Sequence, residues 1–346
     1  MNTTVKASPD DKLDFSLVRG GPLFQLFRRA HLSGPALELV KFRILFIIAI
    51  TWVPLLLLSA IGGHLLGGPE LPFLRDIEAH VRLLIALPVL IMAELAVHQR
   101  LQPVMRTFVE SGIVSAEDTP KFLAATDAAM RLRNSVPIEL ALLVFAATVG
   151  HWVWRSNVAV GAASWYAVPD GATMHLTLAG YWYGFVSIPI AQFILFRWYL
   201  RLLIWFSLLW RVSRLELRLV PTHPDGAGGI GFLGMSTLAF TSIVFAQGAG
   251  MAGVIATRVL YQGQELMSFR ANVAGLIGFF VLIMLGPLLV FSPNLARTKR
   301  RGLIEYGTLA STYVTAFDKK WLRGGLKDEA LLGSADVQSL ADLANS

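Results

Sequence analysis

The chain contains no cysteine and few charged residues. The missing cysteine excludes a disulfide framework, cysteine-ligated zinc or iron–sulfur clusters and thiol catalysis. Only 15% of its 346 residues are charged, against about 25% in soluble domains. With 55% hydrophobic residues, the chain lacks the polar side chains needed to cover a water-facing surface, so much of it is expected to face lipid. Residues 1–42 show no cleavable signal peptide, so the first apolar helix is expected to act as the insertion signal.

Charge is absent, or limited to a single glutamate, over six long apolar stretches. A helix needs roughly 20 apolar residues to cross a bilayer, and each stretch is close to that length. The prediction is an all-α polytopic bundle between residues 43 and 296 with six spans. They lie at about 44–66, 82–99, 136–154, 176–196, 232–257 and 272–294.

The basic residues predict an orientation for these spans. With six crossings, 25 lysines and arginines fall on one side and five on the other. Loops rich in lysine and arginine stay in the cytoplasm, so both ends are predicted to be cytoplasmic. The net charge of +7 then faces anionic headgroups of the bilayer and does not indicate nucleic-acid binding.

Segments outside the spans are short. Residues 1–42 are predicted to form a tail with an amphipathic stretch around Leu23–Val40. Residues 100–133 are predicted to form one or two helices, and the outer loop 155–175 is predicted to be irregular. Residues 297–346 are predicted to form cytoplasmic helices. A heptad-like apolar stripe there favours packing on the bundle or pairing in a homo-oligomer; it comprises Leu303, Tyr306, Ala310, Tyr313 and Phe317.

The last helical pattern in this tail begins at Ser334, a good N-cap residue. The pattern is still running at Ser346 without a C-cap signal, so the natural protein is expected to continue.

Two glutamates interrupt otherwise apolar spans. Glu94 lies six residues before Arg100, and Glu139 lies six residues after Arg133, so in adjacent antiparallel helices both carboxylates come to a similar depth. Carboxylates inside a membrane are costly and usually face a bundle interior or cavity. The pair predicts a cation or proton site, unless each carboxylate pairs with a nearby base such as Arg100, Arg131 or Arg133.

The fourth span continues as a helical pattern through residues 176–218 and carries a basic stripe. Its members are Arg197, Arg201, Arg211, Arg214 and Arg218. One interpretation is a helix that bends and lies among headgroups. The other is a basic wall of an anion pathway or of a regulatory lipid site.

Residues 221–234 are rich in glycine and proline and contain His223 and Asp225. Free amides in such a loop bind anions, and a histidine with an aspartate can ligate a metal. The segment lacks the lysine of a phosphate-binding loop and any preceding strand, and it also fits a plain helix breaker.

Two glutamines, Gln192 and Gln247, lie near the expected midplane. Prolines in four of the six spans predict kinks, which free backbone carbonyls to line a pathway or simply adjust packing. These residues, with the two glutamates and the basic stripe, are the candidates for a pathway or an ion-binding site.

The run Arg197-Trp198, Trp205 and Trp210, followed by residues 219–233 (LVPTHPDGAGGIGFL), resembles a family of uncharacterised bacterial multi-pass inner-membrane proteins. The later segments Tyr306-Gly-Thr-Leu-Ala and Phe317-Asp-Lys-Lys-Trp321 belong to the same resemblance, which covers roughly residues 190–346. It implies a bacterial inner-membrane location and carries no known activity or cofactor.

Three functions remain open from the residues alone. Polar groups within the spans favour a transporter or channel for a small solute or ion. A polar cluster at the interface, built on His223 and Asp225, favours a membrane-embedded enzyme, whose cofactor the sequence does not indicate. The C-terminal helices favour an accessory or scaffold subunit of a membrane complex.

Overall fold

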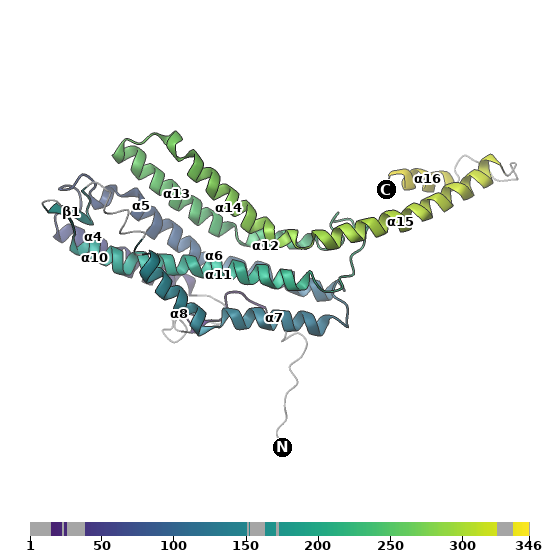
Figure 1. The fold of residues 1–346 in the computed structure, drawn as a ribbon, viewed down its shortest axis with the longest axis horizontal. Helices are drawn as coiled ribbons and strands as arrows, with labels where there is room; N and C mark the ends of the chain where they lie inside the picture. Colours follow the sequence, from purple (N-terminus) through teal and green to yellow (C-terminus); the bar gives the residue numbers. More distant parts are fainter. Residues whose placement is uncertain are drawn as a thin grey trace, which may run out of the picture. The chain divides into compact units, whose positions relative to one another are not determined.

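A computed structural model describes residues 15–22, 24–25, 39–150, 152, 163–170, 173–323 and 335–345. The described chain is mostly helical (Figure 1). It divides into two compact units: Met1–Glu216 with Phe232–Val290, and Leu217–Gly231 with Phe291–Ser346. The predicted amphipathic stretch at Leu23–Val40 lies mostly outside the described residues.

Five helices of the first unit are long and apolar enough to cross a membrane. Several consist of an α-helix joined to a 3-10 or π turn. They are α3–α4 (Val40–Thr51, Val53–Ile61), α5–η2–α6 (Ile77–His80, Val81–Ala86, Leu87–Glu110), α10–η4–α11 (Leu178–Trp182, Tyr183–Ser187, Ile188–Val212), η5–α12–α13 (Gly231–Leu233, Gly234–Ala239, Thr241–Gln262) and η6–α14 (Leu266–Phe269, Arg270–Leu289).

The third predicted span, 136–154, is described only in part. Helix α8 covers Val136–Phe145 and continues as the π turn η3, Ala146–Gly150. Its apolar helical length is shorter than that of the five long helices. Most of residues 151–162 lie outside the described part of the chain.

Several helix ends differ from the predicted boundaries of the spans. The first span ends at Ile61 rather than residue 66, because Gly62 and Gly63 end the helix there, Gly63 with a φ of 72°. The second helix continues through residue 99 to Glu110. The helix predicted through residue 218 ends at Val212, and the last apolar helix covers Leu266–Leu289 rather than 272–294.

Three prolines coincide with breaks or π turns. Pro54 has no N–H to donate to the carbonyl of Ile50, and the indole Nε1 of Trp182 donates to that carbonyl instead, at 2.9 Å. The π turns η2 and η4 lie directly before Pro88 and Pro189. The carbonyl freed by Pro54 is therefore satisfied by a neighbouring helix.

The end of the bundle where α4 stops carries a β-hairpin, where the sequence predicted an irregular loop. Strands β1 (Ala167–Asp170) and β2 (Thr173–Leu176) pair antiparallel, with Val168 opposite His175. The indole Nε1 of the buried Trp165 donates to Oδ2 of Asp76 at 2.8 Å. This bond ties the hairpin region to the start of α5.

The opposite end of the first unit is also helical. Helix α7, Thr119–Arg133, packs along α11 (Figure 1). Together with the end of α6 it confirms the prediction of one or two helices in residues 100–133. The Oδ2 atom of Asp118 accepts the amide of Glu216 at 3.0 Å and fixes the chain that follows α11.

The second unit consists of the loop 217–231 and the C-terminal helices. Helix α15 covers Ser292–Phe317, continues as the π turn η7 (Asp318–Leu322), and is followed by α16 (Ala335–Asn345). The Tyr313 hydroxyl donates to the carbonyl of Asp336 at 2.9 Å, which joins α16 to α15. Ser334, the predicted N-cap, lies outside the described residues.

Candidate functional site

Five charged side chains from four helices meet inside the first unit. They form the buried charge cluster: Arg43 on α3, Glu94 on α6, Glu139 in the first turn of α8, and Arg197 and Arg201 on α11. Each has a relative exposure of 9% or less. Arg197 and Arg201 are four residues apart, so one face of α11 presents both.

Glu94 is the centre of the cluster. Its Oε2 lies 2.6 Å from Nη1 of Arg43, and its Oε1 lies 2.8 Å from Nη2 of Arg201. The Nη1 atom of Arg197 lies 3.8 Å from the same Oε1. The Nε atom of Arg197 lies 2.8 Å from Oε1 of Glu139. Arg197 therefore connects the two carboxylates, so Glu94 and Glu139 lie close together, and their common depth in a membrane stays a prediction.

Three guanidinium groups and two carboxylates are buried together in the cluster. Buried ions cost several kcal/mol each to desolvate, and good pairing geometry only partly offsets this. An arrangement of this cost on helices apolar enough to cross a membrane is a functional-site candidate by default.

Trp198 holds one side of the cluster. Its indole Nε1 donates to the carbonyl of Leu90 at 2.9 Å, which fixes the ring between α11 and α6. The Cζ atom of Arg201 lies 4.5 Å from the centroid of the ring. This cation–π contact holds the guanidinium toward Glu94.

The segment 15–22 passes against the same cluster. The amide of Gly21 donates to Oδ1 of Asn134 at 2.9 Å, and Gly21 has a φ of 87°. A Cβ atom added there would lie 3.6 Å from Oε2 of Glu139 and 4.0 Å from Nη2 of Arg197. Because the segment also buries Phe15 against Trp205, it is part of the packed core.

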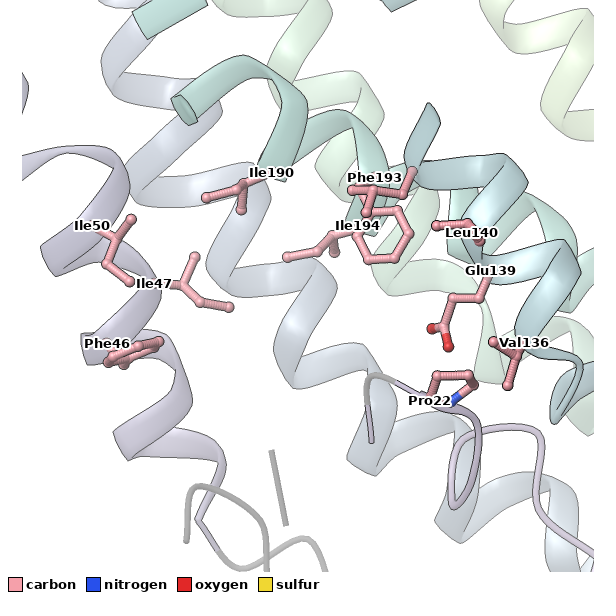
Figure 2. Close-up of a pocket in the computed structure, with 11 residues that line it drawn as sticks. Pro22, Phe46, Ile47, Ile50, Val136, Glu139, Leu140, Ile190, Phe193 and Ile194 are labelled. Carbon is pink, nitrogen blue, oxygen red and sulfur yellow. The ribbon is translucent and has the colours of Figure 1, made fainter. Parts of the chain in front are cut away.

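An apolar cavity of about 530 Å³ adjoins the cluster (Figure 2). Helices α3, α8 and α11 line it, and among the described lining side chains Glu139 is the one that carries a charge. Its carboxylate points toward the cavity in Figure 2. The other lining residues are Pro22, Phe46, Ile47, Ile50, Val136, Leu140, Leu143, Ile190, Phe193 and Ile194.

Helical spacing places the cavity and the cluster on the same faces. On α11, Ile190 and Ile194 precede Arg197 and Arg201 at steps of three and four residues. On α3, Arg43 is followed at the same spacing by Ile47 and Ile50, and on α8 Glu139 by Leu143. Each of these helices therefore carries apolar lining residues of the cavity and a charged residue of the cluster on the same face.

The predicted partners of the two glutamates were wrong. Nη1 of Arg100 donates to the carbonyl of Leu238 at 2.6 Å, and Arg133 donates to the carbonyl of Ser16 and to Asn134. Arg131 is exposed. The partners are instead Arg43, Arg197 and Arg201, because the ends of other helices lie closer to the carboxylates than their own flanking loops.

Sequence reasoning does not single out Arg43, which lies directly before the first predicted span. The signal that was present is its helical spacing to Ile47 and Ile50, which places it on their face.

The predicted basic stripe divides into two groups. Arg197 and Arg201 are buried in the cluster, whereas Arg211, Arg214 and Arg218 are exposed. Helix α11 ends at Val212, so the helical phase that aligned all five residues does not extend to the last two. The stripe is therefore not one continuous wall.

Both midplane glutamines contact protein groups. Nε2 of Gln247 donates to the hydroxyl of Tyr199 at 2.6 Å. Nε2 of Gln192 lies 3.4 Å from the carbonyl of Gly150, and its Oε1 accepts no hydrogen bond from the described residues. They link α11 to two different neighbours, α13 and η3.

In the second unit, the loop 221–231 is organised by Asp225. Its Oδ1 accepts the amides of Ala227 and Gly229 at 2.9 and 3.1 Å, and its Oδ2 accepts that of Gly231 at 2.8 Å. The amides predicted to hold an anion therefore already bind a carboxylate of the same loop. Partial desolvation raises the pKa of Asp225, but these amides and His223 outweigh it and lower the pKa well below its usual range.

The predicted metal pair is present as a contact. Nδ1 of His223 lies 2.8 Å from Oδ1 of Asp225, with both side chains partly exposed. Among the described residues, no group of three or more His, Cys, Asp or Glu side chains is placed to hold a metal ion. The pair supplies at most two ligands in this arrangement.

Comparison with known protein families, with curated proteins and with solved structures finds no match for this chain. The chemistry of the site therefore depends on the residues described above.

Proposed function

We propose that this chain is a six-span protein of a bacterial inner membrane, with both ends in the cytoplasm, that moves a small solute or ion. The observation that carries the proposal is the buried charge cluster next to a cavity. Groups that cost this much to desolvate are kept inside membrane helices where they contact a substrate or an ion.

The position of α8 supports six crossings. The chain leaves α7 at Asn134, beside Gly21, and returns at the opposite end of α3–α4. There the amide of Leu71 donates to the carbonyl of Ala163, and the amide of Trp165 donates to the carbonyl of Leu71. The described ends of this segment, Val136 and Ala163, therefore lie at opposite ends of the bundle, as the ends of a spanning segment do.

Cysteine labelling tests this topology in the cysteine-free background. Cysteines replacing Glu70 and Glu265 are expected to react with an impermeant maleimide from outside the cell. Cysteines replacing Glu110 and Glu305 are expected to react only after permeabilisation. All four positions are exposed. The reverse pattern, or outside labelling at position 110, would contradict the topology.

Flux measurements test transport. The purified chain is reconstituted in liposomes, and the uptake of chloride, acetate and potassium is compared with that of protein-free vesicles. The three buried guanidinium groups are expected to favour uptake of the anions over that of potassium. Arg197→Gln is expected to abolish this preference and Arg211→Gln to leave it, because Arg211 is exposed and outside the cluster.

The predicted route past the glutamines is tested by Gln247→Leu, which removes the bond to Tyr199. Reduced uptake in this variant would support a route that passes Gln247. A chain that raises the uptake of none of the three ions would contradict transport.

A further inference from the structure

We infer that the end of α11 binds an anionic phospholipid on the outer surface of the bundle, with the phosphate at Arg214 and an acyl chain along Phe206 and Leu203. The inference rests on the proposed membrane location and goes beyond transport, because this surface lies outside the buried charge cluster. It is carried by a guanidinium held over an aromatic ring, by the absence of a described carboxylate partner for it, and by an exposed apolar strip that leads to it.

Arg214 is held in place by an aromatic ring. Its Cζ atom lies 4.6 Å from the centroid of the Trp210 ring, within the roughly 6 Å of a cation–π contact. A guanidinium that lies over an aromatic face still has N–H groups with which to donate hydrogen bonds, and its fork of donors fits two oxygens of a phosphate. Because the ring already restrains the side chain, less freedom is lost when an anion binds.

No carboxylate among the described residues pairs with Arg214, which is exposed. The acids nearby in the chain have another basic partner. Asp118 lies 2.7 Å from Nζ of Lys121, and Glu216 also interacts electrostatically with Lys121. A phosphate therefore displaces no described protein carboxylate. A choline head would place an ammonium group beside the guanidinium, which repels it, so a headgroup with a net negative charge is favoured.

An exposed apolar strip leads along α11 to Arg214. Leu203, Phe206 and Trp210 are exposed and follow one another at steps of three and four residues, as Arg214 does, so all four lie on one face. The rings of Phe206 and Trp210 lie 6.2 Å apart. Tyr199, one turn before Leu203, packs its ring against α14. The strip is therefore closed toward the bundle and open toward Arg214.

The position of the strip matches the depth profile of a lipid. It belongs to the helix Leu178–Val212, which is long and apolar enough to cross a membrane, so its exposed apolar residues face acyl chains. From Leu203 to Arg214 the chain advances by roughly 15 Å, enough to pass from hydrocarbon to headgroups. Tryptophan prefers the boundary between the two. A lipid beside α11 therefore meets apolar groups with its chain and Arg214 with its phosphate.

Photolabelling tests the inference. The full chain is placed in nanodiscs of equal parts phosphatidylglycerol and phosphatidylcholine, with a trace of one lipid carrying a diazirine in its acyl chain. Adducts are mapped by mass spectrometry at the strip and, as a lipid-facing reference, at Leu282 and Leu285 on α14, which are exposed. After division by the reference labelling, phosphatidylglycerol is expected to label the strip roughly fivefold more than phosphatidylcholine.

Matched variants locate the headgroup. Arg214→Gln is expected to reduce this preference to nearly none. Arg211→Gln removes the same charge from the same end of α11, but Arg211 is exposed and lies over no ring among the described residues, so most of the preference should remain. Trp210→Leu keeps the strip apolar and removes the ring that holds Arg214, so the preference should fall. Equal labelling by the two lipids, or equal losses in Arg214→Gln and Arg211→Gln, would overturn the inference.

The outcome is separable from that of the flux experiments. Preferential labelling by phosphatidylglycerol without uptake of any ion would keep the lipid site and reject transport of those ions. Uptake without preferential labelling would keep transport and reject the lipid site. Labelling of neither the strip nor α14 by either lipid would contradict the membrane location on which both depend.

Discussion

Glu94 and Asp225 are both carboxylates surrounded by donors, but the donors come from different places. Glu94 is held by Arg43, which is 51 residues away in sequence, and by Arg201, 107 residues away. The amides that hold Asp225 lie within six residues of it. Glu94 therefore connects three helices, whereas Asp225 shapes one loop.

This difference assigns different roles to the two regions. The amides around Asp225 are all directed at a carboxylate that the loop itself supplies, so the loop is complete without a ligand. The buried charge cluster joins side chains from four helices and borders a cavity. The cluster is therefore the better candidate for binding. Substitutions in the two regions are expected to differ in how much stability they remove and in how far through the fold the effect extends.

The largest effect is expected from Glu94→Gln. It leaves the guanidinium groups of Arg43 and Arg201 without their shared carboxylate in a buried position. Breaking a buried ion pair from one side costs about 3–5 kcal/mol, so thermal unfolding in detergent should shift far down and yield should fall.

Adding Arg43→Gln to Glu94→Gln restores the original charge balance and is expected to recover part of the loss. If Glu94→Gln alone unfolds like the unsubstituted chain, the cluster does not hold the helices together.

Asp225→Ala should lower the stability of the loop by about 1–2 kcal/mol, with no effect beyond the loop. The variant frees the amides of Ala227, Gly229 and Gly231. Hydrogen exchange at these three amides is expected to accelerate, while amides of α6 keep their protection. Faster exchange throughout the helices would show that Asp225 stabilises the whole fold, as the cluster is expected to do.

The same carboxylate has a pH signature. Because the folded-state pKa of Asp225 lies below its usual value, its stabilisation is complete above about pH 4 and is lost as pH falls below that. The difference in loop protection between the unsubstituted chain and Asp225→Ala should therefore shrink from pH 7 to pH 3. A difference that stays constant would contradict the assignment.

The sequence predicts the helices and the depth of the charges because both follow from local geometry. Apolar run lengths give five of the long helices, and the spacing of Glu94 and Glu139 from the ends of their spans correctly brings the two residues close together. Helix ends were less accurate where a glycine or a turn decides them, as at Gly63.

The partners of these glutamates were not predictable, because they depend on which helices are neighbours. Flanking residues such as Arg100 and Arg133 are close in sequence, but the helices that contact α6 bring Arg43 and Arg201 closer in space. Likewise, the glycines of the loop indicate unusual backbone angles. They do not indicate that the carboxylate of Asp225 accepts the hydrogen bonds of the amides that these angles orient.

Gly229→Ala tests the backbone of the loop apart from its carboxylate. Gly229 has a φ of 100°, which L residues rarely adopt, so the loop should lose about 1 kcal/mol. The control is Gly248→Ala on α13, where an added Cβ meets nothing within 4 Å, and where alanine favours the helix by up to about 1 kcal/mol. In Gly229→Ala, loop exchange should accelerate and the temperature of thermal unfolding should fall. Gly248→Ala should move both measurements in the opposite direction, and equal changes in the two variants would contradict this.

The smallest effect is expected from His223→Ala. Its Nδ1 contacts Oδ1 of Asp225, but the imidazole is 41% exposed, and exposed ion pairs contribute about 0–1 kcal/mol. The three amides still hold Asp225 without it, so loop exchange should change less than in Asp225→Ala.

Zinc distinguishes the structural role of His223 from a metal site. Two ligands on an exposed loop bind zinc weakly, since stable sites use three or four, and the described residues supply no third. Micromolar zinc should therefore leave the loop exchange of the unsubstituted chain unchanged. Zinc-dependent protection that disappears in His223→Ala would show that this loop, like the cluster, needs a ligand to be complete, and the contrast between the two regions would fail.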